Sequence, residues 1–102
     1  MAVKQIEESE FNKVTKESKK KVLVDCYADW CGPCKMLGPI IEEVSEEEKD
    51  FEFYKLNVDE AEKISMEYGI MSIPTLLIFE NGELVKKSVG FLPKDKIKEL
   101  LK

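Results

Sequence analysis

The sequence predicts an α/β domain built on a mixed central sheet of about five strands, with about four helices covering both faces. Two observations predict this class. Apolar strand-like runs alternate with stretches whose apolar residues recur at helical spacing, which is typical of parallel strands joined by crossover helices. Near the end, Asn81-Gly82 is a strong hairpin signal and adds antiparallel strands. The length fits one domain, so we expect residues 1–102 to form it.

The first half of the chain alternates regularly between the two kinds of segment. A strand is expected near Val3, followed by a short amphipathic helix near residues 8–17. Residues 22–28 form a nearly continuous apolar run with one acid inside it, Asp25. Such a run predicts a strand that is buried on both faces.

The next helix begins at a pair of cysteines, and its apolar residues recur at helical spacing: Met36, Leu37, Ile40, Ile41 and Val44. Pro39 should interrupt and kink this helix, because proline removes an N–H donor and clashes with the preceding turn. The acids that accompany it are expected to form a solvated face: Glu42, Glu43, Glu46, Glu47 and Glu48.

The second half of the chain predicts three further strands, over residues 51–58, 75–79 and 84–89. Asp59 and Glu62 resemble the capping pair of a helix whose inner face is expected to hold Ala61, Ile64 and Tyr68. Pro93 suits the start of a last helix, whose buried stripe is expected to hold Ile97, Leu100 and Leu101.

Composition argues against several classes of function. The net charge is −5 and no segment carries a basic stripe, so nucleic acid is not expected as a partner. No stretch approaches the roughly 18 apolar residues of a membrane span. The first eight residues, which begin with Met1, hold two acids and no apolar run. We therefore expect no secretory signal and a cytoplasmic location.

Two of the three cysteines lie three residues apart in the run Trp30-Cys31-Gly32-Pro33-Cys34, after the buried strand and at the start of a helix. The free N–H groups and the positive end of the helix dipole favour a thiolate there, and the thiolate is the attacking species in disulfide exchange. One helical turn places Cys34 beneath Cys31. We expect Cys31 to be the more exposed, attacking thiol and Cys34 the more buried, resolving thiol.

Two other interpretations of this pair stay open, half of a zinc site and two inert buried thiols. Structural zinc takes four Cys or His ligands, usually as two pairs. The sequence has no histidine and no second Cys-x-x-Cys, so a dithiol–disulfide cycle is favoured. It also has no Gly-x-Gly-x-x-Gly signature for a dinucleotide, so the electrons must come from a partner.

Residues 24–35, which contain the cysteine run, closely resemble the active-site segment of thioredoxins. The resemblance covers nearly the whole chain, and further matching segments are Lys55-Leu56-Asn57-Val58-Asp59, Tyr68-Gly69-Ile70, Ile73-Pro74-Thr75, Asn81-Gly82 and Val89-Gly90. It implies the thioredoxin fold and a thiol–disulfide oxidoreductase that reduces protein disulfides. It also implies re-reduction by a thioredoxin reductase, no bound cofactor or metal beyond the redox-active Cys31–Cys34 disulfide, and a monomer.

The resemblance also implies roles for individual residues. Asp25 resembles the buried carboxylate behind the cysteines, where desolvation raises the pKa and makes it a base for Cys34. Lys55 resembles the lysine that moderates this shift, and Pro74 resembles a cis proline facing the cysteines. The implied docking surface for varied disulfide-containing proteins consists of Trp30, Gly32, Pro33, Val58, Ile73, Pro74, Val89 and Gly90.

Two alternatives remain beside these implications. Cys26 stands where the family often has an aromatic residue. It is expected to be a small buried hydrophobe facing away from Asp25, with a regulatory thiol as the alternative. The alternative to the enzyme is a redox-insensitive docking subunit that uses the surface around Trp30 and Pro74.

Overall fold

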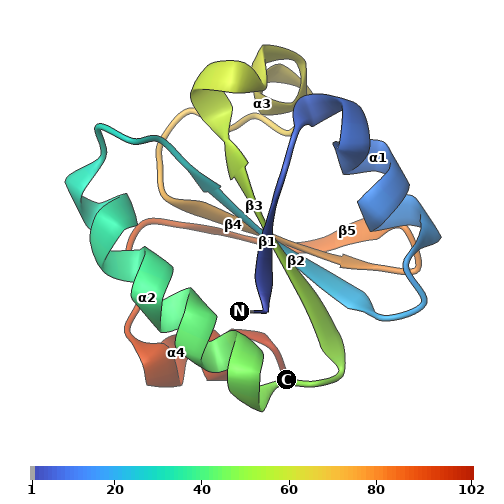
Figure 1. Cartoon of the computed structure of the whole chain (residues 1–102), viewed down its shortest axis with the longest axis vertical. Coiled ribbons are helices and arrows are strands. Elements are labelled where there is room, and N and C mark those ends of the chain that lie inside the picture. The colour runs from blue at the N-terminus through green and yellow to red at the C-terminus, as the bar shows by residue number, and fades with distance from the viewer. Residues whose placement is uncertain (1) are drawn as a thin grey trace.

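The computed structural model describes residues 2–102, whose five strands form one sheet with helices on both faces (Figure 1). The predicted order of five strands and four α-helices is confirmed, and a short 3₁₀ helix is additional. In chain order they are β1 Val3–Ile6, α1 Glu8–Glu17, β2 Lys21–Tyr27, α2 Gly32–Glu47, β3 Phe51–Asn57, the 3₁₀ helix η1 Val58–Glu60, α3 Glu62–Glu67, β4 Thr75–Glu80, β5 Glu83–Val89 and α4 Lys94–Leu100.

The strands lie in the order β1-β3-β2-β4-β5. β1, β3 and β2 are parallel, whereas β4 pairs antiparallel with both β2 and β5. β2 therefore lies at the centre of the sheet, and the loop that follows it leaves from the carboxyl end of a buried strand. Open α/β sheets place their functional sites at such ends.

The strands alternate their side chains between two hydrophobic cores. On one face Val22, Val24 and Cys26 pack with residues of α1 and α3, and on the other Leu23 packs with residues of α2 and α4. Because successive side chains of a strand point to opposite faces, Asp25 points to the side of α2 and Cys26 points away from it. The prediction of a strand buried on both faces is confirmed.

The predicted capping pair of α3 is wrong. The N-cap of α3 is Ala61, which has no side-chain cap, and Asp59 belongs to η1 instead. The carboxylate of Glu8 in α1 accepts a hydrogen bond from the backbone N–H of Ile64 at 2.8 Å. A distant helix therefore supplies the acceptor that the local sequence was expected to supply.

Replacing Glu8 with alanine is expected to destabilise the fold by about 1 kcal/mol, because the N–H of Ile64 in the first turn of α3 then has no acceptor. Urea unfolding measures the change. Glu8→Gln keeps an acceptor oxygen and should lose less, and Lys13→Ala alters an exposed position of the same helix as a control. Equal losses in Glu8→Ala and Lys13→Ala would contradict the capping role.

α2 runs without a break through Pro39, so the predicted interruption is wrong. Proline removes one backbone hydrogen bond, but the residues on both sides of it remain anchored to the sheet. Leu37 precedes Pro39 and Ile41 follows it, and both are fully buried in the same core.

The acidic face of α2 is solvated only in part. The Lys94 ammonium of α4 donates to Glu43 and Glu47 at 2.5 Å each, and Lys98 donates to Glu47 at 2.6 Å. The hydrogen bonds from Lys94 and then Lys98 lower the pKa of Glu47 to about 2. These acids therefore link α2 to α4 rather than facing water alone.

Candidate active site

The cysteine pair lies where β2 passes into α2. Cys31 is the N-cap of α2, with extended backbone angles, and its sulfur accepts a hydrogen bond from the N–H of Cys34 at 3.2 Å. Gly32 and Pro33 form the start of the helix, where a proline without an N–H costs nothing because that N–H would have no helical partner. The sulfur of Cys31 thus occupies the position of an N-cap acceptor.

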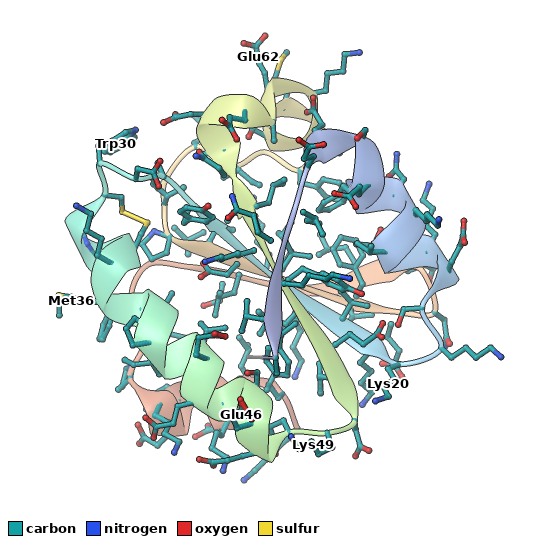
Figure 2. All side chains as sticks on the ribbon, in the orientation of Figure 1. Lys20, Trp30, Met36, Glu46, Lys49 and Glu62 are labelled. Carbon is teal, nitrogen blue, oxygen red and sulfur yellow. A yellow bond between two sulfur atoms is a disulfide. The ribbon has the colours of Figure 1, made fainter. Side chains whose placement is uncertain are left out.

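Cys31 and Cys34 form a disulfide, with their Cα atoms 5.2 Å apart, which Figure 2 shows as the yellow bond at the start of α2. The expectation that Cys31 is the more exposed is wrong for this disulfide form. The two residues are 4% and 5% exposed. Both pack against Ala28, with the half-buried Val58 and Ile73 beside them, so exposure does not distinguish the two thiols.

Asp25 lies behind the pair and is 4% exposed. Burial raises the pKa of its carboxyl from 3.8 to about 7, and the positive charge of Lys55 opposes this rise. Its Oδ1 has no hydrogen-bond partner among the described residues. The Asp25 carboxyl and the Lys55 side chain line one cavity of about 200 Å³. Its lining residues are Asp25, Tyr27, Ala28, Asp29, Cys34, Lys35, Gly38 and Lys55. The structure therefore brings Asp25, Lys55 and Cys34 together.

Pro74 lies on the other side of the pair. Its peptide bond with Ile73 is cis, as the resemblance implied. The carbonyl oxygen of Ile73 lies 3.9 Å from the sulfur of Cys31, which places this loop directly beside the disulfide. The N–H of Gly90 donates to the carbonyl of Pro74 at 2.8 Å and brings the end of β5 to the same loop. Gly90 has a φ of +100°, a conformation that favours glycine.

The remaining predicted surface residues border the cysteines on the outside. Trp30 is 71% exposed and projects beside the disulfide in Figure 2, and Val89 is 58% exposed. Gly32 and Pro33 are also exposed, while Val58 and Ile73 are half-buried. The predicted residues thus meet at one site, with Pro74 buried beneath them.

Sequence reasoning missed three residues of this region. Asp59 accepts a hydrogen bond from the indole N–H of Trp30 at 2.9 Å, and its backbone lies in η1, ahead of the N-cap of α3. The ammonium of Lys55 lies 5.9 Å from the centre of the Tyr27 ring, and Gln5 donates to the Tyr27 hydroxyl at 2.7 Å. Tyr27 stands two positions after Asp25, a spacing that could have placed both on one face, but nothing local singles out Gln5 or Asp59.

Cys26 is fully buried, as expected. Its sulfur packs in the core on the side of α1 and α3, and burial raises its pKa far above the ordinary range of a thiol. Within residues 2–102, no cluster of three or more His, Cys, Asp and Glu residues could hold a metal ion. No helix in that range is long and apolar enough to cross a membrane.

Comparisons with known proteins agree with this geometry. Residues 2–102 match the family model described as Thioredoxin. The chain is 58% identical to a thioredoxin of Mycoplasmoides gallisepticum over 81% of this chain and 83% of that protein. It is 44% identical to a thioredoxin of Bacillus subtilis over 99% of this chain and 96% of that one.

The similarity extends to three dimensions. The structure of a mutant thioredoxin from Halobacterium salinarum NRC-1 matches with a TM-score of 0.88 and 38% identity, covering 96% of this chain and 86% of that chain. The fold, the cysteine pair and the similar proteins all indicate the same family. The chain belongs to the thioredoxin family and is a thiol–disulfide oxidoreductase, a protein-disulfide reductase whose redox-active group is a cysteine pair rather than a bound cofactor.

Proposed function

We propose that this protein is an electron carrier in which Cys31 attacks the disulfide of a protein substrate and Cys34 releases the product. The Cys31 thiolate bonds to one substrate sulfur and expels the other as a thiolate. The Cys34 thiolate then attacks the Cys31 sulfur, closes the Cys31–Cys34 disulfide and releases the second substrate thiolate. The substrate disulfide gains the two electrons that the Cys31 and Cys34 sulfurs lose. Of the two protons that its thiolates take up, one balances the proton that Cys34 gives up and the other comes from water.

The observation that carries this assignment is the hydrogen bond from the N–H of Cys34 to the sulfur of Cys31. A helix N-terminus offers such donors together with the positive end of the dipole, and both favour a thiolate over a thiol. Cys31 is the N-cap of a 16-residue helix, and Cys34 lies within its first turn. The roles of the two thiols therefore follow from their different positions on the helix.

Asp25 is the base for Cys34 in this proposal. A group whose pKa lies near 7 can take a proton and return it at neutral pH. Burial brings the Asp25 carboxyl to that range, and the carboxyl lines the same cavity as Cys34. Lys55 keeps the pKa from rising further. The sequence has no histidine that could serve instead.

The docking surface in this proposal borders the pair and consists of exposed residues with half-buried and buried ones beneath them: Trp30, Gly32, Pro33, Val58, Ile73, Pro74, Val89 and Gly90. An extended substrate segment can lie along the Ile73–Pro74 loop and pair with its backbone, a common mode of peptide recognition. Trp30 adds a large apolar contact, and its bond to Asp59 fixes the ring. Varied protein disulfides fit such a surface because backbone pairing does not depend on side chains.

Several further properties belong to the same proposal. A separate thioredoxin reductase returns electrons to the pair, since the sequence carries no dinucleotide signature of its own. The chain acts as a single domain and a monomer in the cytoplasm. Its net charge of −5 supports solubility and makes nucleic acid an unsuitable partner.

Alkylation of the reduced protein tests the assignment of the two thiols. With iodoacetamide near pH 7, Cys31 is expected to react on the order of tenfold faster than Cys34, because a helix N-terminus raises its thiolate fraction. Peptide mass spectrometry after short exposures measures both rates. Cys26 is the internal control and should stay unmodified in the folded protein, since it is fully buried. Faster modification of Cys34 would reverse the assigned roles.

A further inference from the structure

A row of polar side chains crosses three neighbouring strands of the sheet. Lys55 of β3 pairs with Gln5 of β1 on one side and with Asp25 of β2 on the other. Side chains that are directly paired in neighbouring strands point to the same face. The row therefore runs from the exposed Gln5 at the edge, through the half-buried Lys55, to the buried Asp25.

Tyr27 covers the middle of this row. It stands two positions after Asp25 in the same strand and so points to the same face. Its hydroxyl accepts a hydrogen bond from the Gln5 amide at 2.7 Å, which joins β2 to β1 across the intervening strand β3. The Lys55 ammonium lies 5.9 Å from the centre of the Tyr27 ring, within the range of a cation–π contact.

The Lys55 ammonium thus lies against the Tyr27 ring and lines the same cavity as the Asp25 carboxyl, whose pKa its charge lowers. Asp25 and Lys55 line the cavity that also contains Cys34, and within residues 2–102 Oδ1 of Asp25 has no hydrogen-bond partner. The charged and titratable groups that line the cavity are Asp25, Tyr27 and Asp29 at the end of β2 and beyond it, Cys34 and Lys35 of α2, and Lys55 of β3. Lys55 is the group whose charge acts on the Asp25 carboxyl.

We propose that Gln5 and Tyr27 are positioning residues that hold the Lys55 ammonium beside Asp25, so that the edge strand β1 tunes proton exchange between Asp25 and Cys34. The second half of this statement rests on the base role of Asp25 proposed above. The first half, the positioning of Lys55, does not depend on it. Tyr27 packs beside the cluster of Ala28, Cys31 and Cys34, but its proposed role, like that of Gln5, is to act on Asp25 through Lys55.

Removing the Gln5–Tyr27 hydrogen bond frees the ring and lets the flexible Lys55 side chain move toward water. The attraction between its charge and the Asp25 carboxylate then weakens. The positive charge of Lys55 lowers the pKa of Asp25. Once the Tyr27 ring no longer holds Lys55 in place, the pKa of Asp25 is therefore expected to rise by about 0.5. Gln5→Ala and Tyr27→Phe remove the same bond from its two ends, and Tyr27→Phe keeps an aromatic ring at this position without the hydrogen bond that anchors it.

The experiment follows the carboxyl carbon of Asp25 by NMR as a function of pH in the disulfide form, in which Cys31 and Cys34 do not titrate. Gln5→Ala and Tyr27→Phe should raise the Asp25 pKa by similar amounts, and the double variant by no more than either alone. Asn12→Ala removes an exposed amide from α1 and should leave the titration unchanged. In a Lys55→Met background, Gln5→Ala should have no further effect. Urea unfolding verifies that each variant is folded.

A second readout is the pH dependence of mixed-disulfide release, whose midpoint should move with the Asp25 titration. An unchanged Asp25 titration in folded Gln5→Ala and Tyr27→Phe would overturn the positioning proposal. Additive shifts in the double variant, or an undiminished Gln5→Ala effect without Lys55, would also overturn it. A shifted titration with an unmoved release profile would uphold the positioning and overturn the base role of Asp25.

Discussion

Replacing Cys31 with serine is expected to abolish the reduction of protein disulfides. Serine leaves no thiolate at the helix N-terminus, and its hydroxyl stays protonated near neutral pH and forms no bond to a substrate sulfur. The second half of the cycle is lost as well, because Cys34 has no partner with which to close a disulfide. Insulin reduction with a matching thioredoxin reductase and NADPH measures the loss, which should reach the uncatalysed background.

Cys34→Ser is the matched variant, since it removes the other sulfur of the pair. It keeps the attacking thiol and should accumulate mixed disulfides joined through Cys31, which non-reducing electrophoresis detects. Trapping through Cys34 in the Cys31→Ser variant would reverse the two roles. A wild-type protein that reduced nothing, yet bound partners equally well with both cysteines replaced, would instead favour a redox-insensitive docking subunit.

The second large effect is on stability, through Asp25. Its carboxyl has a pKa of about 7 in the fold against 3.8 ordinarily, so above pH 4 the unfolded chain gives up this proton while the folded chain keeps it. Below pH 4 the carboxyl is neutral in both states and does not lower the free energy of unfolding. As the pH rises from 4 to 7 the free energy of unfolding falls progressively, and above pH 7 this loss is constant. Integrated over this window, wild-type stability should fall by roughly 4 kcal/mol relative to Asp25→Asn.

Urea unfolding of the disulfide form between pH 3 and pH 9 measures this difference. The asparagine variant has the same shape but no charge to bury, so the two stability curves should separate through the window and run parallel above about pH 7. Asp50→Asn changes an exposed carboxyl in the turn before β3 and serves as the control. Curves for wild type and Asp25→Asn that stay parallel throughout would contradict the raised pKa of Asp25.

Most of the fold was predictable because each element carries a local signal. The apolar run around Asp25 and the Asn81-Gly82 turn depend on residues that are close in sequence. The capping of α3 failed for the opposite reason. Asp59 is drawn to the indole of Trp30, and Glu8 reaches Ile64 from a helix 56 positions earlier in the chain. A contact over such a separation leaves no pattern in a short window.

The burial of the cysteines shows the same limit. The helical spacing of Cys31 and Cys34 correctly predicted that the two sulfurs can form a disulfide, but it does not predict the loop that covers them. The cis Ile73–Pro74 loop arrives from more than forty positions away and lies against Cys31. Exposure is a property of everything that packs around a residue, so the predicted difference between the two thiols was wrong.

The sequence by itself determined the order of the elements, the cysteine pair at a helix start and an acid within a buried strand, because local spacing encodes all three. Only the tertiary structure decided what surrounds that acid. Gln5, Lys55 and Asp25 form one row because three separate strands pair in a particular register, and Tyr27 can bridge the row only once they do. Strand register depends on non-local pairing and on the packing of both faces, so it cannot be seen in any one segment.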